Sequence, residues 1–269
     1  MTFVNPFGQQ SEVPPHSHDG ADISGSMPFV RSVGGVNIRN LLIGFRLLTV
    51  VYYTESGVFR KADYPGLRAV RVTCVGGGGG GGGNPSTGSG EAAASVGGGG
   101  GECAMKFLLS DDLAANESVT VGLGGSGGSA GSAGGNGGQS SFGSHCVANG
   151  GRGGSGGVVM SSFPATGEDG AAGGTGGTGD LVIPGGASTV PLMVGSGIRA
   201  GFSSQGGGSF FAPPTGSLRM GGNTTGSAGR GEPAKYPGGG AGGLISRSGA
   251  NATTGLRGAD GVVIVEVWA

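Results

Sequence analysis

The chain has 269 residues, 70 of them glycine, and a formal net charge of -1. Charged residues make up only 12%, and there is no basic excess of the kind that neutralises phosphates, so nucleic acid is a poor candidate partner. The longest apolar stretch, residues 41–53, is interrupted by Gly44 and Arg46 and is too short to cross a bilayer.

A glycine content this high usually indicates disorder, because glycine loses the most backbone entropy on folding and buries no side chain. Two features argue the other way. The charge is low, and stretches rich in Val, Leu and Phe punctuate the glycine runs, whereas disordered segments are usually more charged and less apolar. Residues 1–10 have neither a basic start nor an apolar core, so no signal peptide is expected. We therefore predict a folded protein whose glycine runs are packed backbone.

The chain divides into regions of different composition. Residues 1–40 begin polar and turn-rich and are predicted to form an extended N-terminal arm. Residues 41–75 are predicted to be a β region, with strands at 45–53, 57–62 and 67–75. Residues 76–269 form a glycine-rich domain with candidate strands at 103–109 and 117–123. Its last segment, residues 261–268, is a near-continuous β-branched run and is predicted to close the domain as a strand.

Within the glycine-rich domain, glycine recurs at every third position, for example from Gly125 to Gly137. This is the period of the polyproline II helix, which makes no internal hydrogen bonds, so every buried backbone N–H and C=O must find a partner elsewhere. Parallel rods supply those partners where no Cβ intervenes. We therefore predict all-glycine rows that contact neighbouring rods and a third row, here Arg152, Ser155 and Val158, that points outward.

Collagen is the other fold with a short glycine period, but it needs unbroken triplets and abundant proline. Here the triplets run for only a few turns, and the 13 prolines lie mostly outside them, which excludes collagen. The predicted fold is mostly β with little or no α-helix. Its glycine-rich body consists of packed polyglycine II helices, which are like polyproline II helices, closed by a small β-sheet.

Four sequence elements follow one another in a recognisable order. Residues 69–75 flow into the glycine run 76–83; residues 117–122 precede a glycine triplet; residues 140–143 precede 148–151; and the chain ends on 260–267. In this order the elements resemble the glycine-rich domains of bacteriophage tail fibres and receptor-binding tail-tip proteins. The resemblance covers about four-fifths of the chain.

The resemblance implies a tail-fibre or tail-tip protein of the virion, made in the host cytoplasm and active in attachment to the host cell. Its loops would bind a host receptor, either a polysaccharide or an outer-membrane protein. The arm, residues 1–40, would bind phage tail or baseplate proteins, and the protein would be a homotrimer, although no coiled-coil heptad is present. Two alternatives stay open: a purely structural tail or fibre-assembly component without receptor contact, and a cellular glycine-rich matrix protein.

Aromatic residues in proline-containing loops break the glycine rows. They are Phe163, Phe202, Phe210, Phe211 and Tyr236. Aromatic rings in loops on a rigid scaffold often form binding surfaces, so these residues are candidates for receptor binding. The alternative is that the rings cap the ends of the rods and shield them from water.

The sequence His16-Ser17-His18 is the candidate metal site. In an extended segment both imidazoles point the same way, and three chains around a threefold axis would supply six nitrogens, an octahedral set that suits an iron-like transition-metal ion. The resemblance adds that trimeric phage fibres use His-X-His pairs in this way, with Asp19 and Asp22 as partners that could orient the rings. The alternative is an exposed polar turn, which the flanking proline and glycine favour.

No arrangement of residues indicates an enzyme. Residues 127–131 fit the nucleophile-elbow pattern, but they lie within the period-three run and not at a strand-to-helix turn. Cys74, Cys103 and Cys146 match no zinc-motif spacing, so we predict reduced thiols, with one disulfide and a free thiol as the alternative. His145 and Cys146 would face opposite ways on a strand and are interpreted as structural. We predict a non-enzymatic protein.

Overall fold

The computed structural model describes residues 3–4, 10–11, 46–194, 200–220 and 228–269. The chain divides into two compact units, Met1–Gly44 and Phe45–Ala269. In the first unit, strands β1 (Phe3–Val4) and β2 (Gln10–Ser11) pair in antiparallel fashion. The second unit is called the main unit below.

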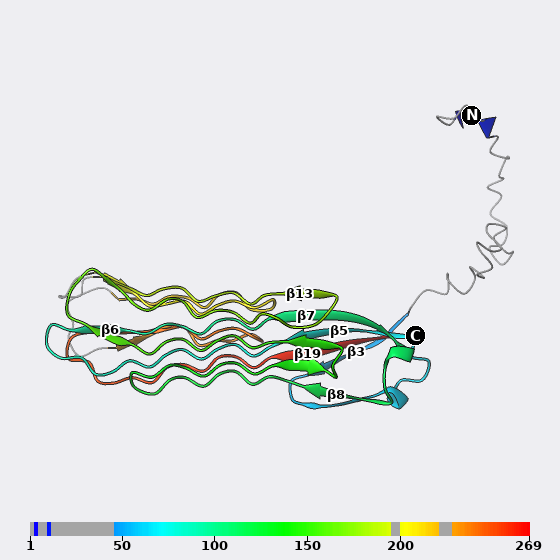
Figure 1. Ribbon diagram of the computed structural model, residues 1–269, viewed down its shortest axis with the longest axis horizontal. Coiled ribbons are helices and arrows are strands. Elements are labelled where there is room, and N and C mark those ends of the chain that lie inside the picture. The colour runs from blue at the N-terminus through cyan, green and yellow to red at the C-terminus, as the bar shows by residue number, and fades with distance from the viewer. Residues whose placement is uncertain (1–2, 5–9, 12–45, 195–199, 221–227) are drawn as a thin grey trace. The chain divides into compact units, whose positions relative to one another are not determined.

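Two antiparallel sheets, called the base sheets, lie at the end of the main unit where its C-terminus lies (Figure 1). One has the strand order β13-β7-β5-β19-β3 and the other β10-β9-β8-β4. The five-stranded sheet contains β3 (Leu47–Tyr53), β5 (Ala69–Val75), β7 (Cys103–Leu109), β13 (Leu181–Ile183) and β19 (Val262–Trp268). The four-stranded sheet contains β4 (Gly57–Arg60), β8 (Asn116–Thr120), β9 (Ser140–Phe142) and β10 (Cys146–Ala148).

The alternation of side chains along β19 creates the main core. Val263, Val265 and Val267 are fully buried, whereas Ile264 and Glu266 between them point to the other face and are half-buried. The buried valines pack with apolar residues of both base sheets and of the segments that flank β8: Phe59, Val70, Val72, Cys74, Ala104, Leu108, Leu113, Val119, Val121, Phe142, Cys146 and Ala148. Each large apolar side chain buried here contributes about 1.5–3 kcal/mol, so this core holds β19 in place between β5 and β3.

Two smaller antiparallel sheets, called the tip sheets, lie at the opposite end of the glycine segments, where Figure 1 labels β6. One has the order β11-β6-β18-β17 and the other β12-β14-β15-β16. A small core of Ala92, Ala94, Met193 and Ile245 joins the two sheets. Their strands are β6 (Ala92–Ala94), β11 (Val158–Met160), β12 (Ala165–Thr166), β14 (Leu192–Val194), β15 (Ala200–Phe202), β16 (Arg219–Met220), β17 (Ala228–Arg230) and β18 (Leu244–Ser246).

The prediction of a mostly β fold with little or no α-helix is confirmed for the described residues. Their helical elements are two 3-10 turns, η1 (Lys61–Asp63) and η2 (Ser110–Asp112). The strand predicted at 57–62 ends at Arg60 because η1 begins at the next residue, Lys61. The strand predicted at 117–123 ends at Thr120. Within the described ranges, no helix has the length and apolar character needed to cross a membrane.

The glycine segments between base and tip are joined by backbone hydrogen bonds whose partners repeat every third residue. The run Gly76–Gly83 lies among the others and is fully buried. Its N–H groups donate to three antiparallel neighbours in rotation, over N···O distances of 2.8–3.0 Å: Gly77, Gly80 and Gly83 to Gly138, Gly135 and Ser132; Gly78 and Gly81 to Ala259 and Leu256; Gly79 and Gly82 to Gly99 and Val96. Its carbonyls accept from three further segments, through Gly125 and Gly128, through Gly151, Gly154 and Gly157, and through Ala241.

These segments approach one another so closely that their interior has no room for a side chain. A Cβ on Gly79 would lie 1.9 Å from the carbonyl oxygen of Arg152, and a Cβ on Gly80 would lie 2.0 Å from that of Ser126. Both obstacles are backbone atoms of neighbouring segments, which cannot rotate away as a flexible side chain can. Glycine is therefore required in this run by packing.

Replacing Gly80 by alanine is expected to lower the free energy of unfolding by about 3 kcal/mol, the upper end of the usual cost of overpacking. The added methyl group would push apart segments that Gly80 holds together through its N–H bond to Gly135 and its carbonyl bond from Gly154. Chemical denaturation of the full chain, followed by circular dichroism, measures the change.

Gly57→Ala is the matched control. Gly57 is exposed in β4, its φ lies outside the left-handed region, and its Cβ would make an ordinary 3.6 Å contact with the Tyr53 ring. This change is expected to be neutral or to stabilise by about 0.4–1 kcal/mol, because alanine restricts the unfolded chain. Equal stability of the two variants would contradict the close packing of the glycine run.

All three cysteines are buried free thiols, in agreement with the predicted reduced state. Cys74 Sγ donates to the carbonyl oxygen of Cys146 at 3.6 Å, and Cys146 Sγ donates to that of Ala104 at 3.3 Å. The contact of Cys74 with Cys146, together with burial, raises the pKa of the Cys74 thiol far above its usual value. Burial raises the pKa of the Cys103 thiol to about 12.

Because all three thiols are buried, the folded chain is expected to resist alkylation by iodoacetamide at pH 8. After denaturation in guanidinium, all three thiols are expected to react. Intact-mass spectrometry counts the added groups. Rapid labelling of the native chain would show that the base core is open to solvent, contrary to the packing described.

Candidate functional site

The outer side of one tip sheet is an exposed apolar face. Leu192 in β14 pairs with Phe202 in β15, Thr166 in β12 pairs with Leu192 from the other side, and Arg219 in β16 pairs with Phe202, so these four positions form one row across the sheet. Phe202 is 40% exposed, Leu192 37%, and Val194, two residues along β14, 44%. Thr166, Leu192, Val194 and Phe202 are called the tip face below.

The opposite side of this sheet is buried, which fixes the direction of the tip face. Met193, between Leu192 and Val194, is 1% exposed and belongs to the tip core. Gly201 pairs with Met193, and a Cβ there would lie 2.5 Å from Ile245 Cδ1. Glycine at 201 therefore lets β15 pack against β18 and turns Phe202 outward.

Polar contacts tie the tip face to the glycine segments. Directly after β15, Ser203 N donates to the Leu218 carbonyl at 2.9 Å, and Leu218 N donates back to Ser203 Oγ at 2.8 Å. Ser204 Oγ accepts from Gly97 N at 2.9 Å. The face is therefore held by bonds to the scaffold on which it stands.

A second pair of connections at the tip is closed by hydrogen bonds. Thr87 N donates to the Ala250 carbonyl, and Ala250 N donates to Thr87 Oγ1, each at 3.0 Å. Gly90 N donates to Ser248 Oγ at 2.9 Å. Residues 85–91 and 247–250 therefore hold each other in position.

The five aromatic residues predicted to bind a receptor lie at two different places. Phe202 lies on the tip face, and Phe163 packs half-buried against the tip core, where it supports the sheets. Phe210 and Phe211 form an edge-to-face pair with ring centroids 5.0 Å apart, and both are exposed.

The turn with Phe210 and Phe211 lies toward the base, beside the turn that carries Tyr236. Ser209 Oγ donates to the Pro237 carbonyl at 2.6 Å, and Gly238 N donates to the carbonyl of Asp260, two residues before β19 begins. Tyr236 is 55% exposed and lines a small cavity of about 50 Å³ whose wall includes three prolines. The structure thus separates these three residues from Phe202.

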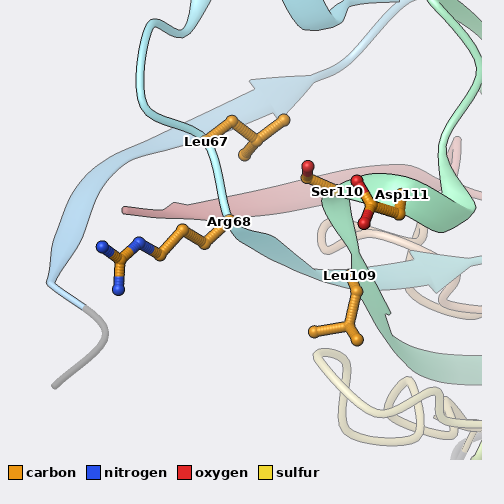
Figure 2. Close-up of a pocket in the computed structure, with 5 residues that line it drawn as sticks. All are labelled: Leu67, Arg68, Leu109, Ser110 and Asp111. Atoms are coloured by element: carbon orange, nitrogen blue, oxygen red, sulfur yellow. The ribbon is translucent and has the colours of Figure 1, made fainter. Parts of the chain in front are cut away.

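A cavity of about 280 Å³ opens at the base, lined by Leu67, Arg68, Leu109, Ser110 and Asp111. Figure 2 shows that the side chains of Arg68 and Asp111 extend in different directions. The two charges do not converge on one point, so the cavity lacks the arrangement of groups that fixes a small ligand.

The described residues contain no group of three or more His, Cys, Asp or Glu side chains that could hold a metal ion. Glu117 is largely buried and lies 3.3 Å from His145 Nε2, and its Oε1 also accepts from Ala114 N at 2.8 Å. Through Glu117, the turn between β9 and β10 and the residue Ala114 before β8 are both tied to β8. His16 and His18, together with any trimer axis they would define, lie outside the described residues, so the metal site and the homotrimer stay predictions.

Comparison with protein families gives one decisive match. Residues 54–268 match the Glycine-rich domain family, a span that includes both base sheets except β3 and both tip sheets. The chain belongs to this family. Comparison with curated proteins finds no match. The family match supports the glycine-rich part of the resemblance, while the assignment to a phage tail fibre stays a prediction.

Leu192 and Val194 are functional candidates that the sequence did not reveal. Their strand has three residues, Leu192–Val194, which is too short for an alternation to stand out. In the structure, Leu192 and Val194 are exposed and Met193 between them is buried. This alternation depends on the tip core, whose position the sequence does not show.

Proposed function

We propose that the protein is a non-enzymatic bacteriophage tail-fibre or tail-tip adhesin that binds a host-cell receptor through the tip face. The observation that carries the proposal is an exposed apolar face of Leu192, Val194 and Phe202 on a scaffold whose interior has no room for side chains. Contiguous exposed apolar surface on a rigid support is typical of interaction sites. The ordered sequence elements that resemble phage glycine-rich domains supply the biological setting.

In this proposal, the glycine segments are polyglycine II helices. Two observations support it: hydrogen-bond partners rotate with a period of three, and the run Gly76–Gly83 bonds to a different segment at each step. The rows of side chains agree as well, since Arg152 and Val158 are exposed whereas Gly151 and Gly154 are buried. Because hydrogen bonds connect the glycine segments along their length, the packed segments hold the tip face in one orientation.

The position of the tip face suits attachment. The chain enters the main unit at the base, where Arg46 and Ala269 exchange backbone hydrogen bonds of 2.8 and 2.9 Å. The tip face therefore lies at the end away from this entry point, free for a receptor if the N-terminal arm binds the tail. Its apolar character favours an outer-membrane protein over a polysaccharide, because apolar and aromatic side chains are enriched at the centres of protein interfaces.

The purified full chain is expected to block adsorption of the phage that carries it, because it occupies the receptor. The variant Leu192→Ser/Val194→Ser/Phe202→Ser is expected to lose at least about tenfold in blocking potency, since it removes the central apolar contacts of the interface. Counting unadsorbed phage at increasing protein concentration measures the effect.

Leu123→Ser is the matched control. Leu123 is 67% exposed on a glycine segment, outside the tip face, and its loss is expected to leave blocking unchanged. If the folded native chain does not block adsorption at all, the adhesin proposal fails and a structural fibre component becomes the better account. If the tip variant blocks as well as the native chain, binding lies elsewhere, with Phe210, Phe211 and Tyr236 next to be tested.

A further inference from the structure

The two turns that carry Phe210 and Tyr236 enclose a small cavity between them. Its volume is about 50 Å³, and its wall includes Thr215, Glu232, Lys235 and Tyr236. These four residues are called the side site below. A cavity of this size has room for a few atoms and not for a whole small molecule. A ligand bound here would therefore insert one substituent and lie across the rim.

Hydrogen bonds hold the side site in place. Gly239 N donates to the Tyr236 carbonyl at 3.0 Å, and Gly242 N donates to the Glu232 carbonyl at 3.0 Å. The prolines of both turns also restrict the backbone, because each fixes its own φ. Binding at the side site therefore orders little of the chain, which lowers the entropic cost of binding.

The Tyr236 ring supplies an apolar surface at the rim of the cavity. It lines the cavity, and more than half of the residue faces solvent. The exposed Phe210 and Phe211 come directly before Ala212, which also lines the cavity. Exposed aromatic rings on a rigid support suit ligands that present an apolar face.

The side site also has hydrogen-bonding groups of both kinds that the fold does not use. Lys235 is exposed, and its ammonium has no hydrogen-bond or ion-pair partner among the described residues. Glu232 Oε2 accepts one long bond of 3.4 Å from Gly216 N, which leaves Oε1 available. Thr215 Oγ1 accepts from Gly206 N at 2.8 Å and keeps its own proton to donate. A ligand thus meets both donors and an acceptor here.

These groups determine which class of ligand fits. An apolar side chain in the cavity would remove the carboxylate, the ammonium and the hydroxyl from water without giving them partners, which is costly. The Glu232 carboxylate would repel an anion, and the Lys235 ammonium would repel a cation. The ligand that fits is neutral, carries several hydroxyl groups and has an apolar face for the Tyr236 ring.

We propose that the side site binds a neutral sugar residue of a cell-surface polysaccharide. The C–H face of the sugar ring stacks on Tyr236, and one substituent, such as a hydroxymethyl group, enters the cavity. The hydroxyl groups of the sugar donate to Glu232 and accept from Lys235. This is a second binding site beside the tip face, and it does not depend on which molecule the tip face binds.

Binding of the full chain to an array of neutral and anionic bacterial surface polysaccharides tests the proposal. The native chain is expected to bind at least one neutral polysaccharide. For that polysaccharide, Tyr236→Ala is expected to raise the dissociation constant by at least about tenfold, because the stacking surface is lost. Tyr236→Phe keeps the ring and is expected to bind nearly as well as the native chain. Isothermal titration calorimetry measures the dissociation constants.

A second variant tests the polar part of the side site. Lys235→Ala removes the ammonium donors without breaking any bond of the described fold, and it is expected to raise the dissociation constant by about fivefold. Tyr52→Ala is the control, since Tyr52 is 66% exposed on β3, outside the side site, and its loss is expected to leave binding unchanged. Circular dichroism checks that the variants fold.

Three results would overturn the proposal: no binding to any neutral polysaccharide, binding to anionic polysaccharides alone, or equal affinity of Tyr236→Ala and the native chain. The tip variant Leu192→Ser/Val194→Ser/Phe202→Ser is expected to bind the polysaccharide as the native chain does. A chain that binds the polysaccharide but does not block adsorption would contradict the adhesin proposal alone. The reverse result would contradict the side site alone.

Discussion

The main unit depends on one constraint: the buried backbone N–H and C=O groups of a glycine segment must bond to neighbouring segments, and consecutive residues bond to different ones. Gly80 illustrates it, since its N–H bonds to Gly135, its carbonyl accepts from Gly154, and the Ser126 carbonyl occupies the space where its Cβ would be. A buried backbone group without a partner costs as much as a lost hydrogen bond, so the segments must stay in contact along their whole length. Glycine is the residue that permits that contact. Glycine also loses more backbone entropy on folding than any other residue, which opposes folding.

This constraint explains what could be predicted from sequence. Local backbone geometry determines the period of three, the buried glycine rows and the outward position of Arg152. These features can be predicted because the glycines repeat at a fixed spacing in the sequence. The closing strand was equally readable, because Val262–Trp268 is a long β-branched run with a clear alternation. The strands that pair with β19 were harder to predict. β5 and β3 lie far from β19 in the sequence and meet it only in the folded chain.

The tip could not be predicted for a related reason. Its strands have two or three residues, and they become strands only because the glycine segments deliver them side by side. The aromatic residues were identified correctly as exceptions to the glycine rows. Their distribution was not, because sequence position does not tell at which end of a rod a loop emerges. Phe202 ends strand β15 at the tip, whereas Phe210, eight residues later, lies in a turn, and the glycines at 206–208 between them run from the tip toward the base.

The same constraint determines where the protein can carry function. A glycine lattice buries little apolar side-chain surface, so stability must come from hydrogen bonds along the segments and from cores at their ends. Substitutions inside the lattice meet backbone atoms, whereas substitutions in the connecting turns do not. Substitutions that the fold tolerates are therefore concentrated in the tip sheets and in the connecting turns. The separation between the tip core around Met193 and the base core around Val265 means that either end can change without disturbing the packing of the other.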